Sequence, residues 1–249
     1  MPCLFLAMSM AHARPACSVK SGVRTAALVE LYTSEGCSSC PPADRALNAL
    51  PGGALVVPLA LHVTYWDHIG WRDPFGQERF DLRQRQLLDS QRRRVAYTPQ
   101  FFVGGRELRG WSANLAGTIR AVNERTAPVT ITLATAPSSR GIVLDAAVQP
   151  AAGAGHSAGA LYVAVTESGL DSQVARGENG GATLHHDAAA RLLLGPVALV
   201  NGKAHLRQDA ALPPGWRRAR LQAVAFVQEQ DGPAILQALG AGVCTAGGR

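Results

Sequence analysis

The sequence has 249 residues, of which 47% are hydrophobic and 17% charged, a composition typical of a globular protein and not of a disordered one. The formal net charge is +6, but the basic residues are almost all arginines scattered along the chain, and the longest basic run is Arg92–Arg94. Nucleic-acid-binding proteins gather such residues into a stripe or patch, so we expect no nucleic-acid partner.

The chain starts with an apolar run that ends near Ala11-His12-Ala13, the small-x-small pattern that signal peptidases cleave. We expect residues 1–16 to form a signal peptide, with a buried N-terminal strand as the alternative. No later stretch reaches the roughly 18 apolar residues that a spanning helix needs, so we expect no membrane span. The predicted location is therefore periplasmic or secreted.

Four cysteines remain once Cys3 leaves with the leader, an even number that suits a compartment where disulfides persist. Cys37 and Cys40 are separated by two serines. Cys17 and Cys244 lie near the two ends of the chain. The simplest pairing is Cys37 with Cys40 and Cys17 with Cys244, although four cysteines allow three connectivities.

Residues 26–32 and 55–63 are short apolar runs that predict two buried strands. Between them apolar residues recur at helical spacing, and Pro41-Pro42 suit a first helical turn, so a helix is predicted over residues 41–50. Cys37 and Cys40 therefore lie where a strand leads into a helix of a β-α-β unit.

A second helix is predicted from about Gln77 to Arg93, then a β-hairpin around the Gly104-Gly105 turn, and then a helix capped by Ser112. This order of elements predicts an α/β thioredoxin-like domain over residues 17–126, with a helical insert.

Beyond residue 126 short apolar runs alternate with turns rich in Gly, Pro, Ser and Ala. Strands are predicted within residues 129–133, 141–144, 160–165, 192–200 and 221–228. We expect a mostly antiparallel, sandwich-like β domain over residues 127–249, closed by a short helix at 231–239.

A cysteine at the start of a helix points its sulfur at unpaired N–H groups and at the positive end of the helix dipole, which stabilise the reactive thiolate. We predict that Cys37 is the exposed nucleophile and Cys40 the resolving thiol that closes the disulfide. Ser38 and Ser39 can donate hydrogen bonds to the sulfur. The substrate would be a thiol or disulfide of a protein or small molecule, and we expect no cofactor.

Thr98-Pro99 precedes the predicted strand at Phe101 and is the expected place for a cis peptide beside the cysteines, where Thr98 could offer its backbone to a bound peptide. An ordinary proline at the start of a strand is the alternative. His62 and Trp66 lie in a loop dense in aromatic residues. Thr98, Pro99, Trp66 and His62 are the predicted substrate-binding residues.

Other roles for the cysteine pair stay open. Zinc is disfavoured because a structural site needs a second pair of ligands. A copper site would combine the two thiolates with His62 or His68, because thiolate and imidazole both suit copper. A purely structural disulfide would add little stability, because it closes a very short loop. A non-catalytic or copper-handling binding protein is therefore the alternative to a metal-free oxidoreductase.

Three motifs, ELYTSEGCSSCPPAD, HVTYWDHIGWRDPF and YTPQFFVGG, resemble the exported thioredoxin-like family catalogued as domain of unknown function 1223. RGENGGATLHHDAAAR, residues 176–191, is similar to a segment of that family's β-rich half. The resemblance implies a thioredoxin-like fold with a fused β domain and export from a bacterial cell, but no established reaction. Thr64 stands where the family pattern is acidic, and Gly180, Ala182, Ala189 and Ala190 replace bulkier or basic residues. We therefore interpret Glu178-Asn179 as a structural turn.

Overall fold

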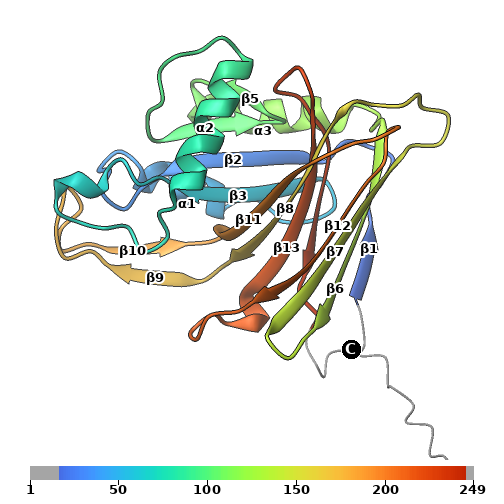
Figure 1. Ribbon diagram of the computed structural model, residues 1–249. Helices are drawn as coiled ribbons and strands as arrows, with labels where there is room; N and C mark the ends of the chain where they lie inside the picture. The colour runs from blue at the N-terminus through green and yellow to red at the C-terminus, as the bar shows by residue number, and fades with distance from the viewer. Residues whose placement is uncertain (1–16, 245–249) are drawn as a thin grey trace, which may run out of the picture.

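In the computed structural model, residues 17–244 are described, and they form fourteen strands and three α-helices (Figure 1). The strands belong to sheets of eight, four and two strands. The chain is therefore mostly β. The expectation of an α/β thioredoxin-like domain followed by a mostly antiparallel, sandwich-like β domain is wrong, because strands and not helices dominate the whole described chain.

The eight-stranded sheet begins at its helix-covered end with four strands. They are β5 (Arg106–Leu108), β4 (Gln100–Val103), β2 (Ala27–Thr33) and β3 (Val56–His62). β2 and β3 are parallel, whereas β2 with β4 and β4 with β5 are antiparallel.

The sheet then continues past β3 into the second half of the chain. The further strands, in order, are β11 (Ala189–Ala198), β8 (Gly159–Glu167), β13 (Leu221–Glu229) and β14 (Ile235–Gly242). β11 joins β3 at the pair Ala189 and Ala60, two small buried residues that let the strands approach. Strands from both sides of residue 126 therefore share one sheet. The domain boundary itself stays a prediction.

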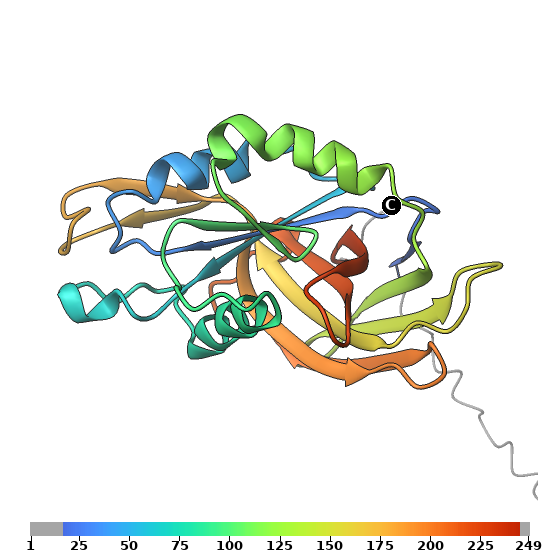
Figure 2. The same cartoon turned by 90° about the horizontal axis from the view of Figure 1, so that it is seen from above.

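The helices cover the two faces of β2. Val29 and Leu31 pack with α1 (Pro41–Asn48) and α3 (Trp111–Asn123), whereas Leu28 and Tyr32 face α2 (Glu78–Ser90). Figure 2 shows α1 and α3 on one side of the sheet and α2 on the other. A strand covered on both faces needs apolar residues throughout, which explains the continuous apolar run.

The four-stranded sheet packs against the β8, β13 and β14 part of the larger sheet. Its strands, in order, are β1 (Cys17–Lys20), β6 (Val129–Pro137), β7 (Gly141–Pro150) and β12 (Ala204–Ala211). Alternate residues of β6 and β7, such as Ile131 and Leu144, are buried against Val163 and Ala225. The Cys17–Cys244 disulfide links β1 to the residues after β14, as predicted.

Two local expectations fail. The closing helix predicted at 231–239 is wrong, because residues 235–242 form β14, whose backbone pairs with β13 along its length. The cap of α3 is Gly110 and not Ser112. The hairpin of β9 (Leu170–Gln173) and β10 (Thr183–His186) was not predicted, and it projects beside α1 and β3 in Figure 1.

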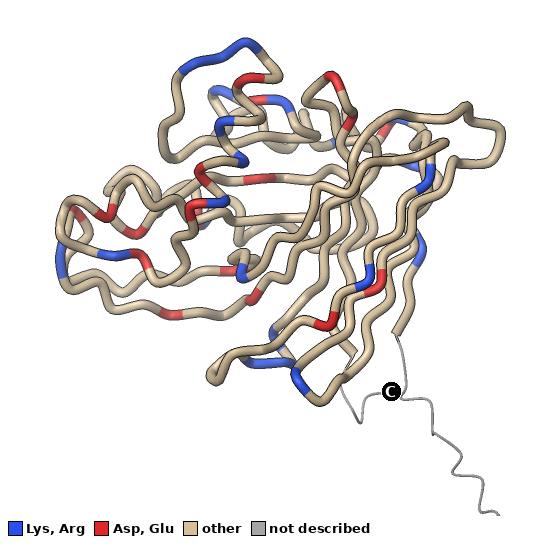
Figure 3. The backbone as a smooth tube through the Cα atoms, in the orientation of Figure 1, with Lys and Arg blue, Asp and Glu red and all other residues tan. Residues whose placement is uncertain are grey.

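The expected signal peptide, residues 1–16, lies outside the described residues. Within residues 17–244, the helices are all too short or too polar to cross a membrane. The Lys and Arg positions are spread over strands, helices and loops and are interspersed with acidic ones (Figure 3).

Candidate functional site

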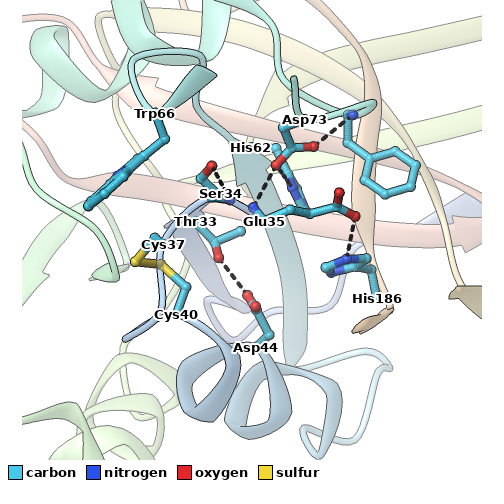
Figure 4. A network of polar contacts seen from close by, with 12 residues as sticks. Thr33, Ser34, Glu35, Cys37, Cys40, Asp44, His62, Trp66, Asp73 and His186 are labelled. Carbon is cyan, nitrogen blue, oxygen red and sulfur yellow. Dashed lines mark hydrogen bonds and ion pairs between the residues drawn. A yellow bond between two sulfur atoms is a disulfide. The ribbon is translucent and has the colours of Figure 1, made fainter. Parts of the chain in front are cut away.

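Cys37 and Cys40 form a disulfide at the point where β2 leads into α1, which confirms the predicted pairing and placement (Figure 4). Cys40 is the cap residue of α1 and Pro41 follows it in the first turn. Both cysteines are fully buried, whereas Ser38 and Ser39 are exposed. The expected exposure of Cys37 is therefore wrong for this disulfide form, because neighbouring segments cover the sulfurs.

Trp66, from the loop after β3, lies over the disulfide in Figure 4. A Cβ atom added to Gly36 would lie 3.1 Å from the Trp66 Cβ, so Trp66 packs closely against the backbone of Gly36. The Trp66 Nε1–H donates to Thr98 Oγ1 at 2.7 Å, and the Thr98–Pro99 peptide is cis. The structure thus links three of the four predicted substrate-binding residues to the segment that holds the cysteines.

The second cover comes from the tip of the β9–β10 hairpin, residues 176–181, hereafter the hairpin tip. The backbone N–H and the hydroxyl of Ser38 both donate to Glu178 Oε2, at 2.9 and 2.7 Å. The Asn179 amide donates to the carbonyl oxygens of Glu35 and Cys37, at 2.8 and 3.0 Å. Glu178-Asn179 is therefore not only a structural turn. It binds the CxxC loop, residues 34–40, from about 140 positions along the chain.

The fourth predicted substrate-binding residue, His62, is not on a surface. Its side chain is 1% exposed, and its Nδ1 lies 2.8 Å from Asp73 Oδ2. Burial is the largest single effect and would lower the pKa of His62, but Asp73, with smaller contributions from Asp44 and Glu35, raises it overall. Burial would likewise raise the pKa of Asp73, but His62 and two backbone N–H donors lower it. His62 is therefore a structural partner of Asp73.

A second buried pair lies behind the CxxC loop. Glu35 Oε1 is 3.1 Å from His186 Nε2, and Glu35 Oε2 accepts a 2.7 Å hydrogen bond from Trp71 Nε1. The Glu35 backbone N–H donates to Asp73 Oδ2 at 2.8 Å, which connects the two pairs (Figure 4). This cluster was not predicted from the sequence. Its only local signal was the number of acidic and histidine residues near the aromatic loop.

Asp44 lies one helical turn after Cys40 on α1, so the two side chains share a face of the helix. The carboxyl group is 7% exposed and accepts a 2.7 Å hydrogen bond from Thr33 Oγ1. Burial raises its pKa, partly offset by His62 and by the bond from Thr33. The site therefore holds a buried carboxyl group, one helical turn after Cys40, that binds a proton more tightly than an exposed one.

The copper alternative named His62 and His68 as ligands. His62 is bound to Asp73, and the Nδ1 of the exposed His68 lies 2.8 Å from the carbonyl oxygen of Tyr65. Between Cys17 and Cys244, no group of three or more His, Cys, Asp or Glu side chains is arranged to hold a metal ion.

A model of the family described as "Protein of unknown function (DUF1223)" matches residues 28–228. The chain is also similar to two solved structures. A protein from Agrobacterium tumefaciens determined by a structural genomics consortium is 22% identical, with a TM-score of 0.61, over 88% of this chain and 95% of that one. HBP35 of Porphyromonas gingivalis is 17% identical, with a TM-score of 0.64, over 90% and 76%. At these identities the likeness concerns the fold alone. No curated protein matches the chain.

Proposed function

The chain belongs to the DUF1223 family of proteins of unknown function, and we propose from its own geometry that it is an exported thiol–disulfide oxidoreductase. One observation carries the proposal. The Cys37–Cys40 disulfide stands at the start of α1, with the buried carboxyl group of Asp44 one turn after Cys40. A disulfide that exchanges needs a sulfur that can leave as a thiolate and a group that can protonate it, and this arrangement supplies both.

The two disulfides differ in what they can contribute to stability. The Cys17–Cys244 bridge spans 227 positions, whereas Cys37–Cys40 spans three. In the chain-entropy account a long loop gives a large stabilisation and a very short one gives little. A purely structural role therefore suits Cys17–Cys244 far better than Cys37–Cys40.

Two disulfides in one chain also support the proposed export. Disulfides persist in the periplasm and outside the cell, whereas cytosolic proteins are kept reduced. Together with the apolar leader expected at residues 1–16, this favours a periplasmic or secreted protein.

Reduction of the pair by a partner dithiol proceeds in two exchanges. A partner thiolate attacks Cys37 Sγ, the bond between the two cysteine sulfurs breaks, and Cys40 leaves with the electron pair and takes the proton of Asp44. The second partner thiolate then attacks the partner sulfur of the mixed disulfide and releases Cys37 as a thiolate. The partner ends as a disulfide, its two thiol protons pass to solvent, and Asp44 regains a proton from solvent. The same steps reversed oxidise a dithiol pair on Cys37 and Cys40 at the expense of a partner disulfide.

Attack on Cys37 requires access, because its side chain is fully buried in the oxidised form. The covering groups are the half-buried Trp66 and the hairpin tip. Trp66 lies in the loop after β3, whose Trp71 and Asp73 hydrogen-bond Glu35, and the hairpin tip binds the CxxC loop through Asn179. In our proposal a partner displaces one of these covers on binding. Thr98 and Pro99 lie next to Trp66 and orient the partner once the indole moves.

Trapping the mixed disulfide tests the proposal. Cys40→Ala lacks the resolving thiol, so incubation with an extract of exported proteins should accumulate adducts that a reducing agent releases. The Cys37→Ala/Cys40→Ala double variant is the matched control and should form none. The proposal is overturned if the folded, reduced Cys40→Ala protein forms no adduct. Tight, stoichiometric Cu(I) binding by the reduced wild type, lost in Cys37→Ala, would instead favour the copper-handling alternative.

A further inference from the structure

Glu178 reaches the CxxC loop from a different part of the chain and takes both hydrogen-bond donors of Ser38 on one oxygen, Oε2. Hydrogen bonds from the Ser38 backbone and hydroxyl lower the pKa of this carboxyl group, so it is ionised at neutral pH. Ser38 follows Cys37 directly. A full negative charge is thus held one residue away from the predicted nucleophile.

Reduction of the Cys37–Cys40 disulfide changes the electrostatic surroundings of the Glu178 carboxylate. A disulfide sulfur is neutral, whereas a reduced cysteine at a helix start carries thiolate character and gains from nearby N–H and O–H donors. The Ser38 donors are bound to Glu178, which leaves Ser39 Oγ, at 3.3 Å from Cys37 Sγ, as the contacting hydroxyl. A neighbouring carboxylate also repels a thiolate. Both effects disfavour the reduced form relative to the disulfide.

We propose that Glu178 is a positioning residue that sets the reduction potential of the Cys37–Cys40 pair, holding it toward the disulfide by binding the Ser38 donors and by its negative charge. The proposal rests on the proposed function, because the potential matters only for a pair that exchanges. It goes beyond that function in assigning the regulation of the pair to the hairpin tip.

The charge of Glu178 can be tested apart from the attachment of the hairpin tip to the CxxC loop, because Asn179 provides that attachment separately. Its amide holds the carbonyl oxygens of Glu35 and Cys37, so it keeps the hairpin tip on the CxxC loop whether or not Glu178 is charged. Glu178→Gln retains an oxygen that can accept from Ser38 and removes only the charge. Glu178→Ala removes the charge and also frees both Ser38 donors.

The test is equilibration of the purified protein with glutathione buffers of graded redox ratio, followed by measurement of the fraction of Cys37–Cys40 reduced. Glu178→Gln should shift the equilibrium constant toward the dithiol by about threefold, the size typical of an exposed charge interaction. A threefold change is about 14 mV for a two-electron couple. Glu178→Ala should shift it at least as far. Asp89→Asn, which removes an exposed acid on α2, is the matched control and should leave the equilibrium unchanged.

Salt dependence separates an electrostatic role from a structural one. The difference between wild type and Glu178→Gln should shrink at high salt, because exposed charges are screened. Asn179→Ala should lower the thermal stability of the protein, but its Cys37–Cys40 reduction potential should depend on salt as that of the wild type does. A Glu178→Gln protein with the wild-type potential, or with a shift that salt does not change, overturns the proposal. These measurements need no partner protein, so a failed trapping experiment and a failed potential shift remain distinct results.

Discussion

The indole of Trp66 donates a 2.7 Å hydrogen bond to the hydroxyl of Thr98, a residue 32 positions further along the chain. This bond joins the cis Thr98–Pro99 segment to the loop after β3, whose Trp66 lies over the Cys37–Cys40 disulfide in Figure 4. Both side chains are half-buried, so water competes only partly for the bond. The cover of the disulfide therefore depends on a contact that one substitution can remove.

Trp66→Phe keeps an aromatic side chain and loses this bond. We expect a loss of about 1 kcal/mol in unfolding free energy, the usual net value of a hydrogen bond. We also expect faster reduction of Cys37–Cys40 by dithiothreitol, because the cover is released more easily. Urea unfolding and the reduction rate measure the two effects. Thr98→Val should have the same two effects. The double variant should lose less unfolding free energy than the sum of the losses in the two single variants. Reduction of both single variants at the wild-type rate would contradict the covering role.

Asp44→Asn should stabilise the oxidised protein at neutral pH. Burial raises the pKa of the folded-state carboxyl group above its ordinary value of 3.8, so ionisation opposes folding. Below pH 3.8 the carboxyl group is protonated in both states and the variant gains nothing. As pH rises from 3.8 toward the raised folded-state pKa, the wild type loses stability relative to the variant, and the difference then stays constant. Urea unfolding over this pH range measures the effect.

The same substitution removes the proton that Asp44 supplies to Cys40. Reduction of the disulfide by dithiothreitol should slow by about a hundredfold, the low end of a general-acid contribution. Asp89→Asn is the matched control and should change neither the rate nor the pH profile. A variant that is stabilised but reduced at the wild-type rate would contradict the proton-transfer role and leave the stability argument intact.

Asp73→Asn should destabilise the protein by about 3 kcal/mol near neutral pH, because it leaves His62 buried without its charged partner. The lowered pKa of Asp73 means that its contribution is present above pH 3.8 and is lost as pH falls through the folded-state pKa. The raised pKa of His62 means that its contribution is present below pH 6.5 and is lost as pH rises through the folded-state pKa. The difference in unfolding free energy between wild type and Asp73→Asn should therefore be largest between pH 3.8 and 6.5. Denaturant midpoints measured across pH test this.

Replacing both Cys17 and Cys244 with serine should lower the unfolding free energy by about 5 kcal/mol, because the bridge restricts nearly the whole unfolded chain. The reduction potential of Cys37–Cys40 should stay at the wild-type value, because the bridge joins β1 to the residues after β14, beside a different core cluster. A changed potential would show that the two disulfides are coupled. An unchanged stability would show that the bridge does not limit unfolding.

Local pattern was enough to predict the elements around the cysteines. The runs that became β2 and β3, the spacing that became α1, and the Gly104-Gly105 turn between β4 and β5 each depend on neighbouring residues. The local sequence pattern gave a wrong prediction where pairing between distant strands decided the structure. Residues 235–242 carry no alternation strong enough to predict a strand, yet they form β14 because the backbone of β13 is there to pair with them.

The sequence alone thus determined the cysteine pair, its position between a strand and a helix, and the proline segment that completes the candidate site. Those features depend on short-range spacing and on the conformational limits of proline and glycine. The tertiary structure alone decided that Ala189 joins Ala60 in one continuous sheet, that the sulfurs are covered, and that Glu178 binds Ser38. The strand junction and the Glu178 contact join residues more than a hundred positions apart, and they form only because the folded backbone brings these residues together.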